Sequence, residues 1–289
     1  MVQEFSSADL RKLYIPPPSS HKGQNGKLMV IGGSKLFHAA SLWALRVASR
    51  IVDMVFYSSV PQNNQIVMEA KEEFRDGIIV PRNKIEDYIK EAECILIGPG
   101  LPRKDGEQKG DNDTKELTES LLKKYPDKKW VLDGGSLQTM DPQLIPRNTI
   151  LTPHYKEFEK LFNSKFQISN FKSNSNDQIS KIQKKVGEMA KKYNCTILLK
   201  RPTDIVCSPK ECLKIKGGNA GMTKGGTGDV LAGLVAALYC KNDDPFLVAA
   251  SGSYINKKAG ESLFKKVGYY FNASDLTNEI PKVMKKYIL

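Results

Sequence analysis

The sequence has few of the residues on which metal sites and disulfide-rich domains depend. It contains three histidines and five cysteines in 289 residues, with no HExxH motif. No two cysteines have the CxxC spacing of a zinc knuckle or a redox dithiol. We therefore predict no metal-ligating residues. Cys207 and Cys212 flank the turn SPKE, so a hairpin could bring them together, but free thiols are the preferred prediction.

Long apolar runs are also missing. The longest, Val230 to Cys240, is shorter than the roughly 20 residues that cross a bilayer, and it predicts a buried helix. The first residues show no apolar segment behind a basic start and no small-residue cleavage site, so no secretory signal is expected. These absences predict a cytoplasmic protein without a membrane partner.

Positive charge exceeds negative charge, with 44 Lys and Arg against 32 Asp and Glu and a net charge of +12. There is no basic tail and no run of basic residues interleaved with aromatics, so no nucleic-acid partner is predicted. Lysines in KIQKKVGEMAKKY fit solvated helix faces, and a positive field around an anionic site is a second interpretation. The composition, 40% hydrophobic and 26% charged, is that of a globular protein, and we predict one domain over residues 1–289 with a short leader at 1–20.

Short apolar runs alternate with helical patterns along the chain. The strand-like run KLMVIGG precedes the helix-like run AASLWALRVASRIVD. Further strand-like runs are ECILIGPG, KWVLDGG and NCTILLKRP. This order predicts βαβ units, a mostly parallel sheet and an α/β fold. Glycine-rich or polar loops follow strands that should end at Ile31, Ile97, Leu132 and Leu151, where such sheets bind ligands. The stretch 169–178 is predicted to be a surface loop.

The run GNAGMTKGGTGD stands directly before the apolar helix. Gly225, Gly226 and Gly228 would let a phosphate approach free N–H groups at the helix start, where the helix dipole favours an anion. Thr227 is the expected N-cap, which leaves Asp229 available as a general base. An acid that merely supports the first helical turn is the alternative. No Walker A loop occurs, and IGGSKLFHA lacks the third glycine of a dinucleotide fingerprint.

Several motifs together carry a family resemblance. They are HKGQNGKLMVIGGSKLFHAA, GPGL at Gly98, LTPHYKEF at Leu151, LLKRPTDIV at Leu198, GNAGMTKGGTGDVLAGLVAAL at Gly218 and GYYFNASDL near the C-terminus. In this order they resemble the ADP/ATP-dependent NAD(P)H-hydrate dehydratases. The resemblance implies a ribokinase-like three-layer fold with helices on both faces of the sheet.

The resemblance also implies a reaction and its residues. A nucleotide, ADP or ATP with Mg²⁺, would phosphorylate the hydroxyl of the S epimer of hydrated NADH or NADPH, and elimination of phosphate would restore NAD(P)H. Asp229 would be the base, and the substrate site would comprise Ala40, Gly100, His154 and Asp229. The nucleotide site would comprise Lys200, Arg201, Pro202, Thr203, Asp204, Gly225, Gly226, Thr227 and Gly228. A homo-oligomer, possibly a tetramer, and the absence of a fused epimerase domain are further expectations.

Some positions depart from the family pattern. Phe37 and Ala39 stand where relatives have Tyr and Gly, Gly135 replaces the second acid of DADAL, and Arg201 replaces a small residue. Two other functions stay open. One is a small-molecule kinase of the same fold, acting on a hydroxymethyl or hydroxyethyl group. The other is a nucleic-acid-binding or regulatory protein that has lost catalysis.

Overall fold

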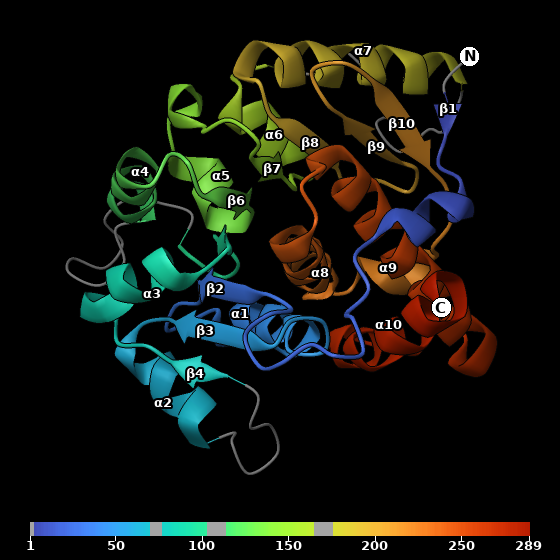
Figure 1. Ribbon diagram of the computed structural model, residues 1–289. Coiled ribbons are helices and arrows are strands. Elements are labelled where there is room, and N and C mark those ends of the chain that lie inside the picture. Colours follow the sequence, from blue (N-terminus) through green and yellow to red (C-terminus); the bar gives the residue numbers. More distant parts are fainter. Residues whose placement is uncertain (1–2, 70–76, 103–113, 165–175) are drawn as a thin grey trace.

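The computed structural model describes residues 3–69, 77–102, 114–164 and 176–289, with only the backbone of residues 176 and 177. Within these ranges the chain forms one sheet of ten strands with helices on both faces (Figure 1). The predicted α/β three-layer fold is confirmed. The predicted loop at 169–178 lies outside the described residues up to 175, and from Asn176 the chain is helical.

The sheet is parallel through most of its width. Its order is β1-β10-β9-β8-β7-β6-β5-β2-β3-β4, and only β9 runs antiparallel to its neighbours. The strands are β1 (Gln3–Glu4), β2 (Lys27–Ile31), β3 (Met54–Ser58), β4 (Ile78–Ile79), β5 (Cys94–Ile97), β6 (Lys129–Leu132), β7 (Ile150–Leu151), β8 (Thr196–Leu199), β9 (Asp204–Cys207) and β10 (Cys212–Ile215). The strand ends predicted at Ile31, Ile97, Leu132 and Leu151 are confirmed.

Apolar side chains cover both faces of the strands because the pleat alternates. Leu28 and Val30 of β2 point to one core, and Met29 and Ile31 point to the other. The first core is covered by α1 (His38–Ala48), α8 (Thr227–Lys241), α9 (Pro245–Val267) and α10 (Ala273–Ile288). The second is covered by α3 (Ile85–Glu91), α4 (Thr114–Lys124), α5 (Gly134–Thr139), α6 (Tyr155–Leu161) and α7 (Asn176–Tyr193). A further helix, α2 (Pro61–Glu69), and the short 3-10 turns η1 (Ser7–Lys12), η3 (Arg82–Lys84), η4 (Pro142–Leu144) and η5 (Ala220–Thr223) complete the described elements.

The strand order reverses between β2 and β5. From β2 the chain moves outward through β3 and β4, then returns to β5 on the other side of β2 and continues to β6, β7 and β8. At the carboxyl edge, the connection that leaves β2 and the connection that leaves β5 therefore run in opposite directions along the sheet. Open α/β sheets bind their ligands at such a reversal.

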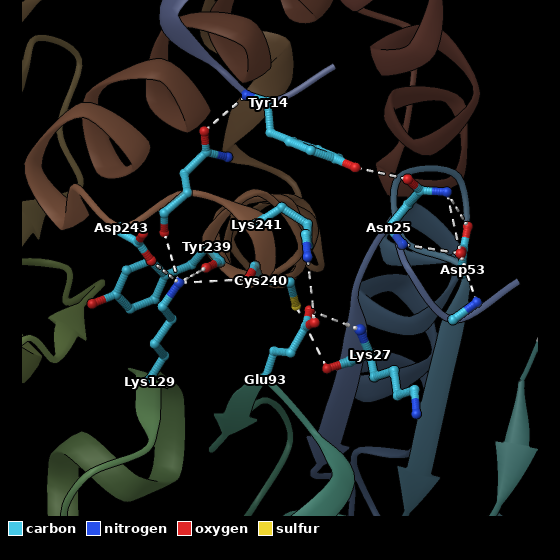
Figure 2. A network of polar contacts seen from close by, with 12 residues as sticks. Tyr14, Asn25, Lys27, Asp53, Glu93, Lys129, Tyr239, Cys240, Lys241 and Asp243 are labelled. Atoms are coloured by element: carbon cyan, nitrogen blue, oxygen red, sulfur yellow. Dashed lines mark hydrogen bonds and ion pairs between the residues drawn. The ribbon is translucent and has the colours of Figure 1, made fainter. Parts of the chain in front are cut away.

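The buried helix α8 crosses the sheet from the carboxyl edge to the amino edge. Its apolar run Val230 to Cys240 is buried, as predicted. At its end, the Nζ of Lys129 donates to the carbonyl oxygens of Tyr239 (3.2 Å) and Asn242 (3.0 Å) and pairs with Asp243 (2.7 Å; Figure 2). The lysine thus places positive charge where unpaired carbonyls and the negative end of the helix dipole lie.

The opening motif HKGQNG lies at this same amino edge. The Oδ2 of Asp53 accepts from the N–H groups of Gly23 (2.8 Å) and Asn25 (3.0 Å), and the hydroxyl of Tyr14 donates to Asn25 Oδ1 (2.8 Å; Figure 2). The Sγ of Cys240, near the end of α8, contacts the carbonyl oxygen of Lys27. The motif fixes the entry into β2 and the end of α8, at the edge opposite the loops of the predicted site.

The prediction of five free thiols is wrong at two positions. Cys207 and Cys212 form a disulfide, because β9 and β10 pair antiparallel with these two residues directly opposite. Cys94, Cys195 and Cys240 are free and buried. In the described ranges no helix has the length and apolar character to cross a membrane.

Replacement of Lys129 by Met should lower the free energy of unfolding by about 1–2 kcal/mol, because carbonyls at the end of α8 lose their donor. Urea denaturation measures this. The exposed Lys123 of α4 supplies the control, and Lys123→Met should change stability by less than about 0.5 kcal/mol. Equal effects of both changes would mean that Lys129 contributes nothing specific.

Candidate active site

A cavity of about 420 Å³ opens at the carboxyl edge, where the strand order reverses. It is lined by the segment after β2, including Ala40, and by the loops that follow β5, β6, β7 and β8. The N-terminal end of α8, the mouth of α8, lines the rest of the cavity. The lining includes Phe37, Ala40, Trp43, Gly100, Asp133, Gly135, His154, Glu157, Lys200, Gly225, Gly226, Gly228 and Asp229. The sequence-based expectation that loops after successive strands share one edge is confirmed.

The start of α8 depends on a glycine at position 226. Gly226 is the N-cap with φ of +90°, and a Cβ there would lie 2.3 Å from the ring of Trp43. Gly225 has nothing within 4 Å of the corresponding position, and at Gly228 the nearest atom is Lys200 Nζ at 3.4 Å. The backbone at the helix mouth is therefore open to the cavity, with the positive end of the dipole behind it.

Thr227 does not cap the helix as the sequence suggested. It is the first helical residue, it is buried, and its hydroxyl donates to the carbonyl oxygens of Met222 (2.7 Å) and Lys224 (2.9 Å). The cap position falls on Gly226 because a left-handed turn must precede the helix. Thr227 therefore ties the first turn of α8 to the loop that precedes it.

Asp229 lines the cavity from the first turn of α8. Burial raises the pKa of this carboxyl to about 7, the negative charge of Asp133 adds to the rise, and the Lys200 ammonium opposes it. A carboxyl with such a pKa is a proton acceptor suited to neutral pH.

Lys200 lies among the acids of the site. Its Nζ is 2.7 Å from Asp133 Oδ1 and 4.0 Å from Glu157 Oε2, and the hydroxyl of Thr152 also donates to Asp133 (2.8 Å). Burial alone would lower the pKa of Lys200, but the Asp133 and Glu157 carboxylates outweigh it and raise that pKa. The side chain stays a cation at the edge of the helix mouth, next to Gly228.

His154 and Glu157 form the capping box of α6. The Nδ1 of His154 accepts from the N–H groups of Lys156 (3.1 Å) and Glu157 (3.2 Å), and Glu157 Oε2 accepts from the N–H of His154 (2.9 Å). Glu157 also accepts from Gln138 (3.1 Å). Our sequence analysis missed Glu157, although an acid three residues after a polar residue is the sequence pattern of a capping box.

The predicted site residues fall into two groups. Ala40, Gly100, His154, Lys200 and Asp229 line the cavity with the three glycines of the GGTGD loop. Arg201 to Asp204 and Thr227 do not line it: Arg201, Thr203, Asp204 and Thr227 are buried, and Pro202 is exposed. Their part in nucleotide binding stays a prediction.

The structure gives a reason for one departure from the family pattern. A Cβ at Gly135 would lie 2.3 Å from the carbonyl oxygen of Leu101, so the first turn of α5 has no room for an acid there. Phe37 and Ala39 both line the cavity. Nothing in the described contacts accounts for the exchange of Tyr for Phe at position 37.

Metal-binding groups are a separate question. In the described part of the chain, no three His, Cys, Asp or Glu side chains are arranged to hold a metal ion. The Asp133 carboxylate already accepts from Lys200 and Thr152.

A larger cavity of about 880 Å³ lies beside α2, lined by residues such as Ser59, Asn64 and Arg82, and contains none of the acids described above.

The comparisons with known proteins agree with one another. The family model described as NAD(P)H-hydrate dehydratase matches residues 28–282. The ADP-dependent (S)-NAD(P)H-hydrate dehydratase of Nitrosopumilus maritimus is 33% identical, and the match covers 99% of both chains. The bifunctional NAD(P)H-hydrate repair enzyme of Methanocaldococcus jannaschii is 35% identical over 96% of this chain. The chain spans about half of that relative, 52%.

Solved structures share the fold. The ADP/ATP-dependent NAD(P)H-hydrate dehydratase of Bacillus subtilis, co-crystallised with ATP and Mg²⁺, has a TM-score of 0.78 at 21% identity, with 99% of each chain covered. A hydroxyethylthiazole kinase of Pyrococcus horikoshii has a TM-score of 0.60 at 12% identity, covering 92% of this chain and 89% of the kinase. Both likenesses concern the fold alone.

The carboxyl of Asp229 should titrate near pH 7. Below that pH it holds a proton and cannot act as a base, so any step that needs this base slows as the pH falls. Carboxyl ¹³C NMR of labelled protein follows the titration. In Asp133→Asn a neighbouring negative charge is gone, so the pKa of Asp229 should move downward. An Asp229 that titrates near 4 in the wild type would contradict this assignment.

Proposed function

This chain belongs to the NAD(P)H-hydrate dehydratase family, and on that premise we propose that it converts the S form of hydrated NADH or NADPH back to NAD(P)H in a nucleotide-dependent dehydration. The observation that carries the proposal is the position of Asp229. Its carboxyl lines the same cavity as the open backbone at the mouth of α8.

The reaction divides into two steps. In the first, the hydroxyl oxygen of the hydrated ring attacks the terminal phosphorus of the nucleotide, the bond to the leaving phosphate oxygen breaks, and Asp229 accepts the hydroxyl proton. In the second, the carbon–oxygen bond to the new phosphate breaks with help from the ring nitrogen lone pair. Loss of a proton from the adjacent carbon restores the double bond. Inorganic phosphate leaves, with AMP from ADP or ADP from ATP.

The surrounding residues support the first step. The N–H groups at the start of α8 and the Lys200 ammonium supply positive charge for the phosphoryl group in transfer. His154 lines the cavity; its Nδ1 is occupied by the cap of α6, and its Nε2 lies 3.5 Å from Glu157 Oε1. Ala40 and Gly100 provide a wall without side-chain bulk, which suits a flat ring.

Mg²⁺ fits as a companion of the nucleotide. The described side chains offer no set of three ligands, and Asp133 is engaged by Lys200. Phosphate oxygens and waters are the ligands that Mg²⁺ keeps in nucleotide sites. We propose no step that uses a resident ion. Function as a homo-oligomer in the cytoplasm stays a prediction.

A small-molecule kinase of the same fold is the second candidate, since the hydroxyethylthiazole kinase has the same architecture. A kinase would leave a stable phosphate ester, whereas the proposed reaction regenerates reduced nicotinamide and free phosphate. The match to the dehydratase model over residues 28–282 favours the dehydratase. A nucleic-acid-binding role has only the net charge of +12 in its favour.

Incubation with chemically hydrated NADPH, Mg²⁺ and either ADP or ATP should restore the near-ultraviolet absorbance of NADPH. Asp229→Asn should reduce kcat by about 10²- to 10⁴-fold, because the proton acceptor is lost, with nucleotide affinity nearly unchanged. Lys265→Met, on the exposed face of α9, serves as the control with wild-type turnover. Wild-type rates in Asp229→Asn would remove this residue from the mechanism.

Gly228→Val should weaken nucleotide binding before it affects folding. A Cβ at this position has only Lys200 Nζ nearby, at 3.4 Å, so the fold tolerates it, but the branched side chain enters the space in front of the helix mouth. We expect the nucleotide KM to rise by about tenfold or more. Thermal denaturation checks folding, and a raised KM for the hydrate alone would contradict the assignment of this loop to the nucleotide.

A further inference from the structure

A buried lysine on α9 connects two loops that are far apart in the sequence. Lys257 is 6% exposed, and its Nζ donates to the carbonyl oxygens of Arg201 (3.1 Å) and Pro202 (2.9 Å). The same nitrogen reaches the carbonyl oxygen of Gly217 at 3.5 Å. One side chain therefore holds the turn after β8 and the loop after β10 at a fixed separation.

The charge of Lys257 is balanced within the same network. Its Nζ lies 3.4 Å from Asp204 Oδ2, which also accepts from the hydroxyl of Ser253 (2.6 Å). The Oδ1 of Asp204 accepts from the N–H of Arg201 (2.6 Å). Each charged group is thus paired and hydrogen-bonded, which is the condition under which buried ions are tolerated.

The next turn of α9 holds the second loop as well. Glu261 Oε1 accepts from the N–H of Gly218 (3.2 Å), and the amide of Asn219 donates to the carbonyl oxygen of Gly260 (2.8 Å). This loop leads through η5 directly into Gly225 and the mouth of α8. The turn at Arg201 follows Lys200, which lines the cavity. Both connections run from α9 to segments that continue into the site.

We infer that Lys257 is a positioning residue for the phosphoryl donor: it sets the distance between the turn at 201–204 and the loop at 217–225. The inference rests on the proposed function, because the turn at 201–204 is predicted to hold the nucleotide and the loop at 217–225 leads to Gly225, another predicted nucleotide residue. Lys257 does not line the cavity and has no direct contact to offer a ligand there. An apolar side chain would fill the same space without the cost of burying a charge. The distinctive contribution of Lys257 is therefore its contacts with three carbonyl oxygens, which fix two backbone segments.

The test separates donor binding from substrate binding. Lys257→Met removes the donor group and keeps the side-chain length. Its nucleotide KM, and the Kd for ADP with Mg²⁺ measured by calorimetry, should rise by about ten- to a hundredfold. The KM for hydrated NADPH should stay within about twofold. Lys265→Met, on the exposed face of the same helix, should leave all three values unchanged. A folded Lys257→Met with wild-type nucleotide affinity, or with both KM values raised equally, would overturn the inference.

Two further measurements keep the test decisive. Lys257→Met could unfold because the buried Asp204 carboxylate loses its cation. In that case the double variant Lys257→Met/Asp204→Asn, which also lacks the negative charge, should fold but still bind ADP weakly. In the wild type, ADP should slow amide exchange at 201–204 and 217–219 together, and protection of neither segment would overturn the inference. ADP binding is read without turnover. A wild-type protein that binds ADP but restores no NADPH would therefore contradict the proposed function without contradicting this inference.

Discussion

The site depends on an unequal set of charges: among the described residues, three carboxyl groups and one ammonium group line the cavity. The Lys200 ammonium lies 2.7 Å from Asp133 and offsets that carboxylate most directly. Asp229 is left buried near a second negative charge, and that is why its pKa lies near 7. In the proposed reaction, the nucleotide would bring further negative charge to this cavity, and that charge alone would raise the pKa of Asp229 further. In the proposed reaction, the positive end of the α8 dipole would face this charge and stabilise the phosphoryl group.

The same helix connects this charge set to the rest of the fold. α8 begins in the cavity and ends at the amino edge, where Lys129 supplies the charge that its last carbonyls need. The motif HKGQNG packs at that far end, beside Cys240, and its contacts are with Asp53 and Tyr14. A motif that is distinctive in sequence is thus remote from the candidate active site. Its place in the structure is to fix where β2 begins and where α8 stops.

Sequence predicted the features that follow from local periodicity. Strands flanked by helices, glycine loops at strand ends and the open mouth of α8 could be read from spacing, and the structure brings most of the predicted residues to one cavity. Features that depend on register could not. The Cys207–Cys212 disulfide requires two strands to pair at one residue position, and the Lys257 contacts require α9 to cross beneath two separate loops. The Thr227 cap failed because Gly226 takes the left-handed turn, which composition alone did not reveal.

His154 has a structural role at the start of α6 and a predicted role in the substrate site. From sequence, the family resemblance predicted His154 as part of the substrate site. In the structure its Nδ1 accepts two backbone N–H groups at the start of α6, so the ring is neutral with its hydrogen on Nε2. A ring fixed in this tautomer can donate to an acceptor on the substrate, or to Glu157, whose Oε1 lies 3.5 Å away. It cannot accept a proton at Nδ1 without releasing the helix cap. The geometry therefore argues against His154 Nδ1 as a base, which is consistent with the proposal that Asp229 accepts the proton.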